Sequence, residues 1–407
     1  MELMPGYKRS DVGVIPDDWD AKPLGEIGDS LIGLTYRPSE VRKYGTLVLR
    51  SSNVQNGTLC FDDNVFVETD IPERIMVRPG DILVCVRNGS RDLIGKSALI
   101  DERAVGMTFG AFMGIFRSEY GQFLRHVFQS GIFKKQITEH LGATINQITN
   151  KSLNSFQVPL PPTSDERTKI ANALSDVDAL VATLDKMISK KIDLKQAAMR
   201  HLLTGKTRLP GFTGAWETKQ LKDLAHLSKT GINPSSTPES LFTHFSLPAF
   251  DANETPVIES GASIGSNKFA VPPGAVLLSK LNPRIPRVWA PNCIPSNSVC
   301  STEFLVLIPN EGVDRNFFKY LCASTAVASQ MELHAIGTTG SHQRIHPTQV
   351  MAIEVKTPTD DDERSAISSV LRDIDAELSN LNRRRDKTVE LKQAMMQELL
   401  TGKTRLA

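Results

Sequence analysis

The chain has 407 residues, of which 40% are apolar and 23% charged, so we expect two or more globular domains rather than one core. The formal net charge of +1 lacks the basic balance typical of nucleic-acid binders, so any DNA affinity must come from cations clustered on one face. Five cysteines without a Cys-x-x-Cys pair argue against zinc and a disulfide framework, and there is neither a signal-peptide pattern nor a membrane-length apolar run. We therefore expect a cytosolic protein.

The second half of the chain repeats the first at a shift of 197 residues. Residues 194–209 return at 391–406 with 13 of 16 positions identical. The same shift carries Trp19 onto Trp216, each opening a Trp-x-x-Lys-x-Leu motif. This period is too long for a solenoid, so the chain is two copies of one unit. We divide it into a first domain with an N-terminal arm (1–160), a first long helix (161–209), a second domain (210–357) and a second long helix (358–407).

Each globular half has the pattern of mixed strands, turns and a few helices, which predicts an α+β fold. A Pro-Gly turn opens the central strand of each half, at Pro79-Gly80 and Pro273-Gly274. We expect strands at 46–50, 79–86 and 111–116, with counterparts at 245–247, 273–279 and 303–308.

A cationic loop follows the central strand in both copies. The first copy carries Arg87, Asn88, Ser90 and Arg91, with Lys96 close by, and the second carries Lys280, Asn282, Arg284 and then Arg287. Such side chains at a loop tip pair with base edges and phosphates. Any one of them alone is more often a solvated surface charge. Because the cluster recurs at matched positions, we predict that these residues bind DNA.

A second matched loop precedes the final strand of each half. It supplies Thr144, Asn146 and Gln147 in the first copy, and Ser341, His342, Gln343 and Arg344 in the second. Hydrogen-bonding side chains on a glycine-rich backbone suit base or phosphate contacts, so we predict DNA binding here too. An ordinary polar turn explains these residues equally well.

From Pro161 onward the pattern becomes helical, with Ser164 or Asp165 as the expected N-cap. Apolar residues follow steps of four and three in both copies, the spacing of a coiled-coil seam, at Ile170, Leu174, Val177, Val181, Leu184 and Ile188, and at Ile367, Leu371, Ile374, Leu378 and Leu381. Each pattern stops at a glycine suited to a helix C-terminus, Gly205 or Gly402. We expect two helices of some 39 residues, paired antiparallel, which would place the two halves at opposite ends of the pair.

The coil alone explains the apolar repeat, and a purely structural coil is the simplest interpretation of the period. Packing does not require matched polar residues, however, and Lys195, Gln196 and the tail at 204–209 also recur. We interpret these polar residues as two copies of a partner-docking surface.

Catalytic patterns are weak. The segment 89–97 resembles a phosphate-binding P-loop, but five residues separate its glycines where four are needed, and Ala98-Leu99-Ile100 is typical of a strand rather than a helix. Asn282-Pro283 is followed by Arg284, so the Asn-Pro-Pro-aromatic motif of amino-methyltransferases is missing, and no His-Glu-x-x-His motif indicates a metal site. We predict a binding protein with no catalytic or metal-ligating residues.

Two variable domains, each closed by a helix with a Leu-Lys-Gln-Ala…Leu-Leu-Thr-Gly-Lys-Thr-Arg-Leu tail, resemble the specificity (S) subunits of type I restriction-modification systems. The Trp-x-x-Lys-x-Leu openings fit that family, as do Asp165-Glu166-Arg167 and Asp362-Glu363-Arg364. The resemblance covers essentially the whole chain.

This resemblance implies a prokaryotic, non-catalytic subunit whose two target-recognition domains read the two parts of a split double-stranded DNA target. The halves differ between their matched ends, which implies an asymmetric target. Two methyltransferase (M) subunits would dock on the helices, bringing S-adenosylmethionine, and the complex could recruit restriction (R) subunits that use ATP and Mg. A coiled-coil adaptor with two protein-binding heads is the alternative.

Overall fold

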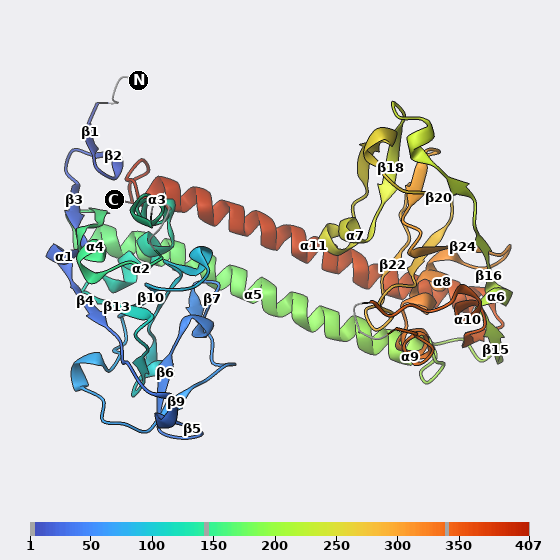
Figure 1. The fold of residues 1–407 in the computed structure, drawn as a ribbon, viewed down its shortest axis with the longest axis horizontal. Coiled ribbons are helices and arrows are strands. Elements are labelled where there is room, and N and C mark those ends of the chain that lie inside the picture. The colour runs from blue at the N-terminus through green and yellow to red at the C-terminus, as the bar shows by residue number, and fades with distance from the viewer. Residues whose placement is uncertain (1–4, 142–145, 338–341, 407) are drawn as a thin grey trace. The chain divides into compact units, whose positions relative to one another are not determined.

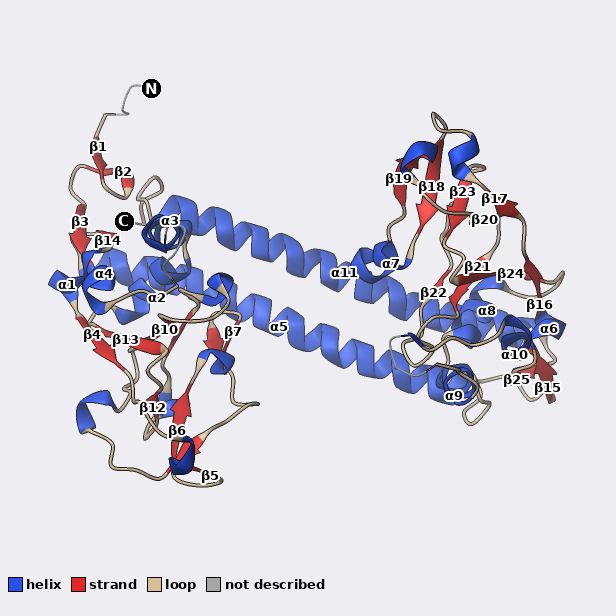
Figure 2. Ribbon diagram, in the orientation of Figure 1, coloured by secondary structure: helices blue, strands red, loops and turns tan. Residues whose placement is uncertain are grey.

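The computed structural model describes residues 5–141, 146–337 and 342–406, which divide into two compact units. Unit 1 comprises residues 1–185 and 384–407, and unit 2 comprises residues 186–383. Unit 1 is therefore discontinuous in sequence, because the last segment of the chain completes the domain built by the first. Two long helices, α5 (Ser164–Leu202) and α11 (Asp361–Leu399), each contribute a stretch to both units. Figures 1 and 2 show the elements.

Unit 1 is built on two four-stranded sheets. One has the order β11-β10-β13-β4 and the other β12-β6-β9-β5, and the remaining strands form the pairs β1-β2, β7-β8 and β3-β14. The strands are β1 (Tyr7–Ser10), β2 (Gly13–Pro16), β3 (Asp20–Pro23), β4 (Asp29–Ile32), β5 (Val41–Arg42), β6 (Thr46–Leu49), β7 (Val54–Gln55), β8 (Thr58–Leu59), β9 (Phe66–Val67), β10 (Ile82–Cys85), β11 (Ser97–Leu99), β12 (Thr108–Phe109), β13 (Met113–Arg117) and β14 (Gln157–Leu160). The shorter helices are α1 (Leu24–Ile27), α2 (Gly121–Gln129), α3 (Gly131–Leu141) and α4 (Asn150–Ser155).

Unit 2 has a four-stranded sheet, β16-β24-β21-β22, a five-stranded sheet, β17-β20-β23-β18-β19, and the pair β15-β25. Its strands are β15 (Trp216–Gln220), β16 (Ala225–Ser228), β17 (Gly231–Ile232), β18 (Leu241–Phe245), β19 (Val257–Ser260), β20 (Lys268–Ala270), β21 (Val276–Ser279), β22 (Val288–Trp289), β23 (Ser298–Cys300), β24 (Phe304–Pro309) and β25 (Glu354–Pro358). Its shorter helices are α6 (Leu221–Leu224), α7 (Leu247–Asn253), α8 (Arg315–Cys322), α9 (Thr325–Leu333) and α10 (Pro347–Met351).

The repeat in the sequence is a repeat in the structure. The long helices begin at residues 164 and 361 and end at residues 202 and 399, each time 197 residues apart. Lys22 lies opposite Val158 on the β3-β14 pair, as Lys219 lies opposite Val355 on the β15-β25 pair. The predicted mixed α/β fold with two long helices is confirmed.

The helices pair antiparallel within each unit. In unit 2, Lys191 of α5 pairs with Glu377 of α11, and further along α5 Lys195 pairs with Asp375 at 2.6 Å. Unit 1 has the equivalent ion pair with the two helices exchanged: Lys392 of α11 pairs with Asp178 of α5 at 2.6 Å. The seam residues predicted from the period are buried or half-buried in both helices.

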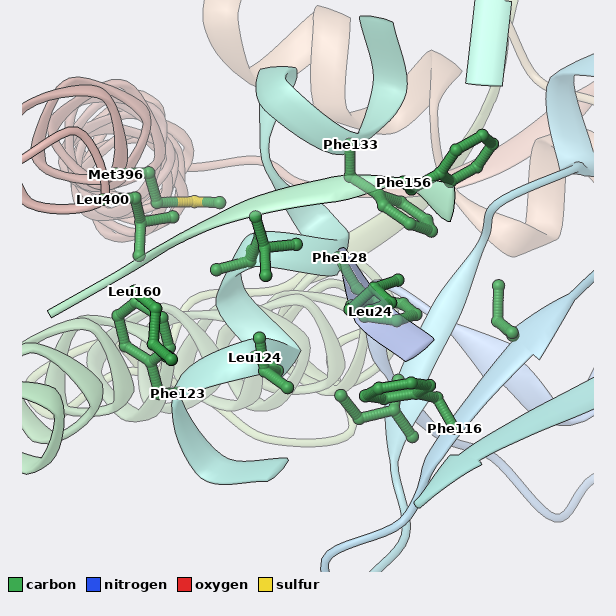
Figure 3. Close-up of a cluster of buried hydrophobic side chains, with 14 of the residues drawn as sticks. Leu24, Phe116, Phe123, Leu124, Phe128, Phe133, Phe156, Leu160, Met396 and Leu400 are labelled. Atoms are coloured by element: carbon green, nitrogen blue, oxygen red, sulfur yellow. The ribbon is translucent and has the colours of Figure 1, made fainter. Parts of the chain in front are cut away.

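One hydrophobic cluster of unit 1 joins strands β10 and β13, the short helices and both long helices. Phe128 stacks on Phe133 with ring centroids 4.3 Å apart. Met396 and Leu400, from the end of α11, lie in the same cluster of buried side chains (Figure 3). The end of α5 contributes Leu203 to the core of unit 2 in the matching way. Each domain core therefore includes a long-helix end.

Two local predictions are wrong. The cap of α5 is Thr163, whose hydroxyl accepts a hydrogen bond from the Glu166 N–H at 3.2 Å, so Ser164 already lies in the first helical turn. The strand expected at 245–247 ends at Phe245, because the Ser246 hydroxyl caps α7 by accepting from the Ala249 N–H.

Candidate nucleic-acid interface

The two predicted loops of unit 1 meet at one place. Arg87, at the end of β10, forms an isolated bridge with Gln147. The Ile148 N–H donates to the Val86 carbonyl at 2.7 Å. Residues some 60 positions apart thus form one edge, which the sequence did not reveal because the bridge is non-local.

The loops of unit 2 meet in the same way. Leu281 bridges Arg344, and the Ile345 N–H donates to the Lys280 carbonyl at 3.1 Å. The Asn282 N–H donates to the Gln343 carbonyl at 2.7 Å. Because Gln147 and Arg344 are 197 residues apart, this edge is part of the repeat.

The side chains of the first loop differ in their surroundings. The Arg87 guanidinium lies over the Phe112 ring, 5.2 Å from its centroid. The Asn88 side chain accepts from the Ser90 N–H at 3.0 Å, which shapes the turn. Arg91 is exposed in the short helical turn that follows. Lys96 is half-buried and donates to the Ser51 carbonyl at 3.4 Å, so it lies beneath the loop rather than at its tip.

In the second loop, Asn282 takes a left-handed conformation with φ 52°, and its side chain accepts from the Arg284 Nε at 3.1 Å. Lys280 immediately follows β21. Arg287 is held by Asp251 through contacts of 2.6 and 2.9 Å, and its side chain is 13% exposed. Its guanidinium therefore already has an internal partner within unit 2.

The predicted residues of the second loops lie partly at these edges. Asn146, Gln147, His342, Gln343 and Arg344 are among the described residues, whereas Thr144 and Ser341 lie outside them. Arg344 donates to Glu303 through Nε and Nη2, at 3.0 to 3.2 Å, and this carboxylate raises the pKa of the Arg344 side chain.

Sequence reasoning missed two residues at the edges, Phe112 and Glu303. Both were included in predicted strands, at 111–116 and 303–308, whereas the observed strands β13 and β24 begin one residue after Phe112 and Glu303, and a single sequence does not show where a strand gives way to a loop edge. Phe112 also lines a cavity of about 530 Å³ together with Tyr36, Arg50, Ser52 and Asp63. In the part of the chain that the structure describes, Arg50 Nε and Ser52 Oγ are buried without a hydrogen-bond partner.

The polar repeat in the long helices has a largely internal explanation. Lys195 and Lys392 pair across the helices, as described above. Arg405 binds Asp18 and Glu166 in unit 1, and Arg208 binds Glu363 in unit 2. The recurring cations Lys195, Lys392, Arg208 and Arg405 thus each have a carboxylate partner within their own unit. Gln196 and Gln393 remain exposed.

Other site classes have little support. Over the described residues, no group of three or more His, Cys, Asp or Glu side chains could hold a metal ion, and no helix is long and apolar enough to cross a bilayer. The segment after Gly95 forms strand β11 from Ser97, as predicted, where a P-loop would begin a helix.

Comparison with known proteins finds similarity to type I restriction enzyme specificity subunits. Residues 16–194 match the family model described as the type I restriction modification DNA specificity domain. The EcoKI type I restriction enzyme specificity subunit of Escherichia coli K12 is 27% identical over 206 residues, which cover 48% of this chain and 44% of that protein. The chain thus aligns with less than half the length of that relative.

Two further matches extend over the whole chain. A Methanocaldococcus jannaschii protein provisionally named the MjaX type I restriction enzyme specificity subunit is 24% identical over 98% of this chain and 97% of its own. The S subunit of a type I restriction-modification system from M. genitalium shares the fold, with a TM-score of 0.59 at 14% identity, covering 98% of this chain and 99% of that one. Residues 16–194 thus match a type I restriction-modification DNA specificity domain, and the relatives matched along the chain all indicate a type I restriction-modification specificity subunit.

Proposed function

We propose that the chain is the non-catalytic specificity subunit of a type I restriction-modification complex and that its two heads read different parts of one asymmetric, bipartite DNA target. The observation that carries this proposal is the matched edge in each unit, where a cationic loop and a polar loop meet on equivalent strands. The edges share their backbone but not their side chains, so two different sequences would be read.

The test is selection from a randomised duplex library by the full chain. A specificity subunit yields two conserved half-targets of different sequence separated by a fixed gap. The adaptor alternative, two protein-binding heads without DNA readout, yields no consensus. Selection of the same half-target by both heads would contradict the asymmetric reading.

Removing cations from one edge should weaken binding without unfolding the protein. Arg87→Ala and Lys280→Ala should each cost about 1–3 kcal/mol if the side chain contacts a base, measured by titration on the selected duplex. Arg287→Ala serves as the contrasting variant, because its guanidinium is bound by Asp251 and its loss should lower thermal stability first. Unchanged affinity in both Arg87→Ala and Lys280→Ala would exclude these loops from the interface.

We also propose that two methyltransferase subunits dock on the long helices and supply S-adenosylmethionine, with ATP and Mg used by restriction subunits where the complex includes them. Support comes from Leu194 and Leu391, which are 51% and 54% exposed at positions 197 residues apart. Large apolar side chains at the same exposed position of two helices are suited to two copies of one partner.

Leu194→Glu combined with Leu391→Glu should abolish co-purification of the partner, because a buried interfacial charge without a counter-ion is strongly unfavourable. The stoichiometry of each complex is measured by light scattering. Each single variant should retain one partner per chain. A complex of wild-type stoichiometry in the double variant would place the docking surface elsewhere.

A further inference from the structure

One position at the edge is structurally equivalent in the two units, but it carries an apolar side chain in unit 1 and a carboxylate in unit 2. On paired strands β10 and β13, Cys85 lies opposite Met113, and on β21 and β24, Ser279 lies opposite Phe304. One step further along, the Val86 N–H donates to the Phe112 carbonyl at 3.1 Å, and the Lys280 N–H donates to the Glu303 carbonyl at 2.9 Å. Phe112 and Glu303 therefore occupy the same place, beside the junction of the two loops.

In unit 1 this place holds an exposed aromatic ring. Phe112 is 58% exposed, although its neighbours on β13 are buried in the core. It borders the 530 Å³ cavity, and Arg87 covers one face of its ring. An exposed phenyl ring contributes little to the core, because burial is what makes it stabilising. Its position beside this cavity suits a ligand with an apolar group.

In unit 2 the same place holds a carboxylate joined to a cation. Glu303 accepts from both Nε and Nη2 of Arg344, which remains 48% exposed, and Nη1 donates to the His342 carbonyl at 3.3 Å. The pair is therefore held in one geometry at the surface. It presents hydrogen-bond donors and an acceptor side by side.

We propose that this matched position reads one base pair in each head, with Phe112 contacting the methyl group of a thymine and the Arg344–Glu303 pair reading a G·C pair. This rests on the proposed DNA-reading function. Thymine alone presents a methyl group in the major groove, whereas G·C presents the N7 and O6 acceptors of guanine beside the N4 donor of cytosine. A phenyl ring complements the first and an arginine–glutamate pair the second.

For the first head, the probe is the selected duplex with deoxyuridine replacing one thymidine at a time, which removes only the methyl group. The full chain should lose about fourfold in affinity at one position, the value of one buried methyl group. Phe112→Ala should bind thymine and uracil duplexes equally there, and Phe112→Leu should keep the discrimination. Tyr44→Ala, which removes another exposed aromatic ring of unit 1, should leave it unchanged.

For the second head, 7-deazaguanine replaces one guanine at a time and removes its N7 acceptor. The full chain should lose about tenfold at one position, as expected for a hydrogen bond from a charged donor, and Arg344→Ala should be insensitive there. Glu303→Gln should relax the preference at the same base pair. Glu259→Gln, which alters the His244–Glu259 contact in another sheet, should not.

Unchanged melting temperatures would show that each variant is folded. If the full chain selects no consensus, the proposed function fails. The full chain could instead select a consensus while no base substitution has an effect that depends on Phe112 or Arg344. The DNA-reading function then stands, and the assignment of this position is overturned.

Discussion

Arg208→Ala is expected to destabilise unit 2 by about 3–5 kcal/mol, because it leaves a buried carboxylate without its counter-ion. Glu363 is fully buried at the start of α11. Its two oxygens accept from Nε and Nη2 of Arg208, the latter at 2.6 Å, and the Trp216 indole N–H adds a longer contact of 3.4 Å. Trp216 cannot replace the arginine, because an indole N–H carries no charge.

Hydrogen exchange during urea titration measures this effect in unit 2 separately from unit 1. Arg200→Ala is the matched control, since Arg200 is an exposed arginine near the end of α5, eight residues before Arg208. Combining Arg208→Ala with Glu363→Leu should recover part of the loss, because no unpaired charge remains. Equal stability of Arg208→Ala and Arg200→Ala would show that Glu363 has found another partner.

His126→Leu is expected to make unit 1 resistant to mild acid. His126 is completely buried on α2, and burial, reinforced by the neighbouring Arg125 and Lys392 and opposed by Asp178, lowers the pKa of its imidazole from 6.5 to about 3. The unfolded chain binds a proton below pH 6.5 and the folded chain does not, so stability falls as the pH drops from 6.5 toward 3. The loss reaches about 1.4 kcal/mol per pH unit, or about 2 kcal/mol at pH 5.

The repeat itself suggests the substitution. Arg125 binds Asp178 as Tyr320 binds the equivalent Asp375, and the residue after Tyr320 is a buried leucine, Leu321. The free energy of unfolding is measured between pH 5 and 7.5 for the wild-type chain and for His126→Leu. Because the carboxylates titrate in both proteins, the difference between them reports the imidazole alone. His140→Leu, a less buried histidine of the same unit, controls for the lost side chain. If the free energies of unfolding of the wild type and His126→Leu changed in parallel with pH, the lowered pKa of His126 would be refuted.

Periodicity and repetition predicted the long helices, because a seam from Ile170 to Ile188 leaves few alternatives to a helix. The strands around Val84 and Val276 were equally predictable from their apolar runs and Pro-Gly turns. The exact ends of two elements could not be predicted, because they depend on local side-chain hydrogen bonds. Thr163 rather than Ser164 caps α5. Ser246 caps α7 and thereby ends the preceding strand.

The candidate site was predictable only in part. The cationic loops were found from residue type, but that Arg87 meets Gln147 is a long-range fact of the sheet. The internal role of Arg287 depends on Asp251, 36 residues earlier in the chain, and composition does not reveal such a pairing. The polar repeat in the helices was interpreted as a surface, whereas Lys195 and Lys392 are half-buried in ion pairs.

The discontinuity of unit 1 also bears on its synthesis. Residues 186–383 separate the two segments that build this unit, and a ribosome adds about 5–20 residues per second, so the first domain emerges roughly 10–40 s before its missing helix. Until then the core around Leu160 is open where Met396 and Leu400 will pack. Unit 2 is contiguous and can close as it is made, so the domain translated first is the one that finishes folding last.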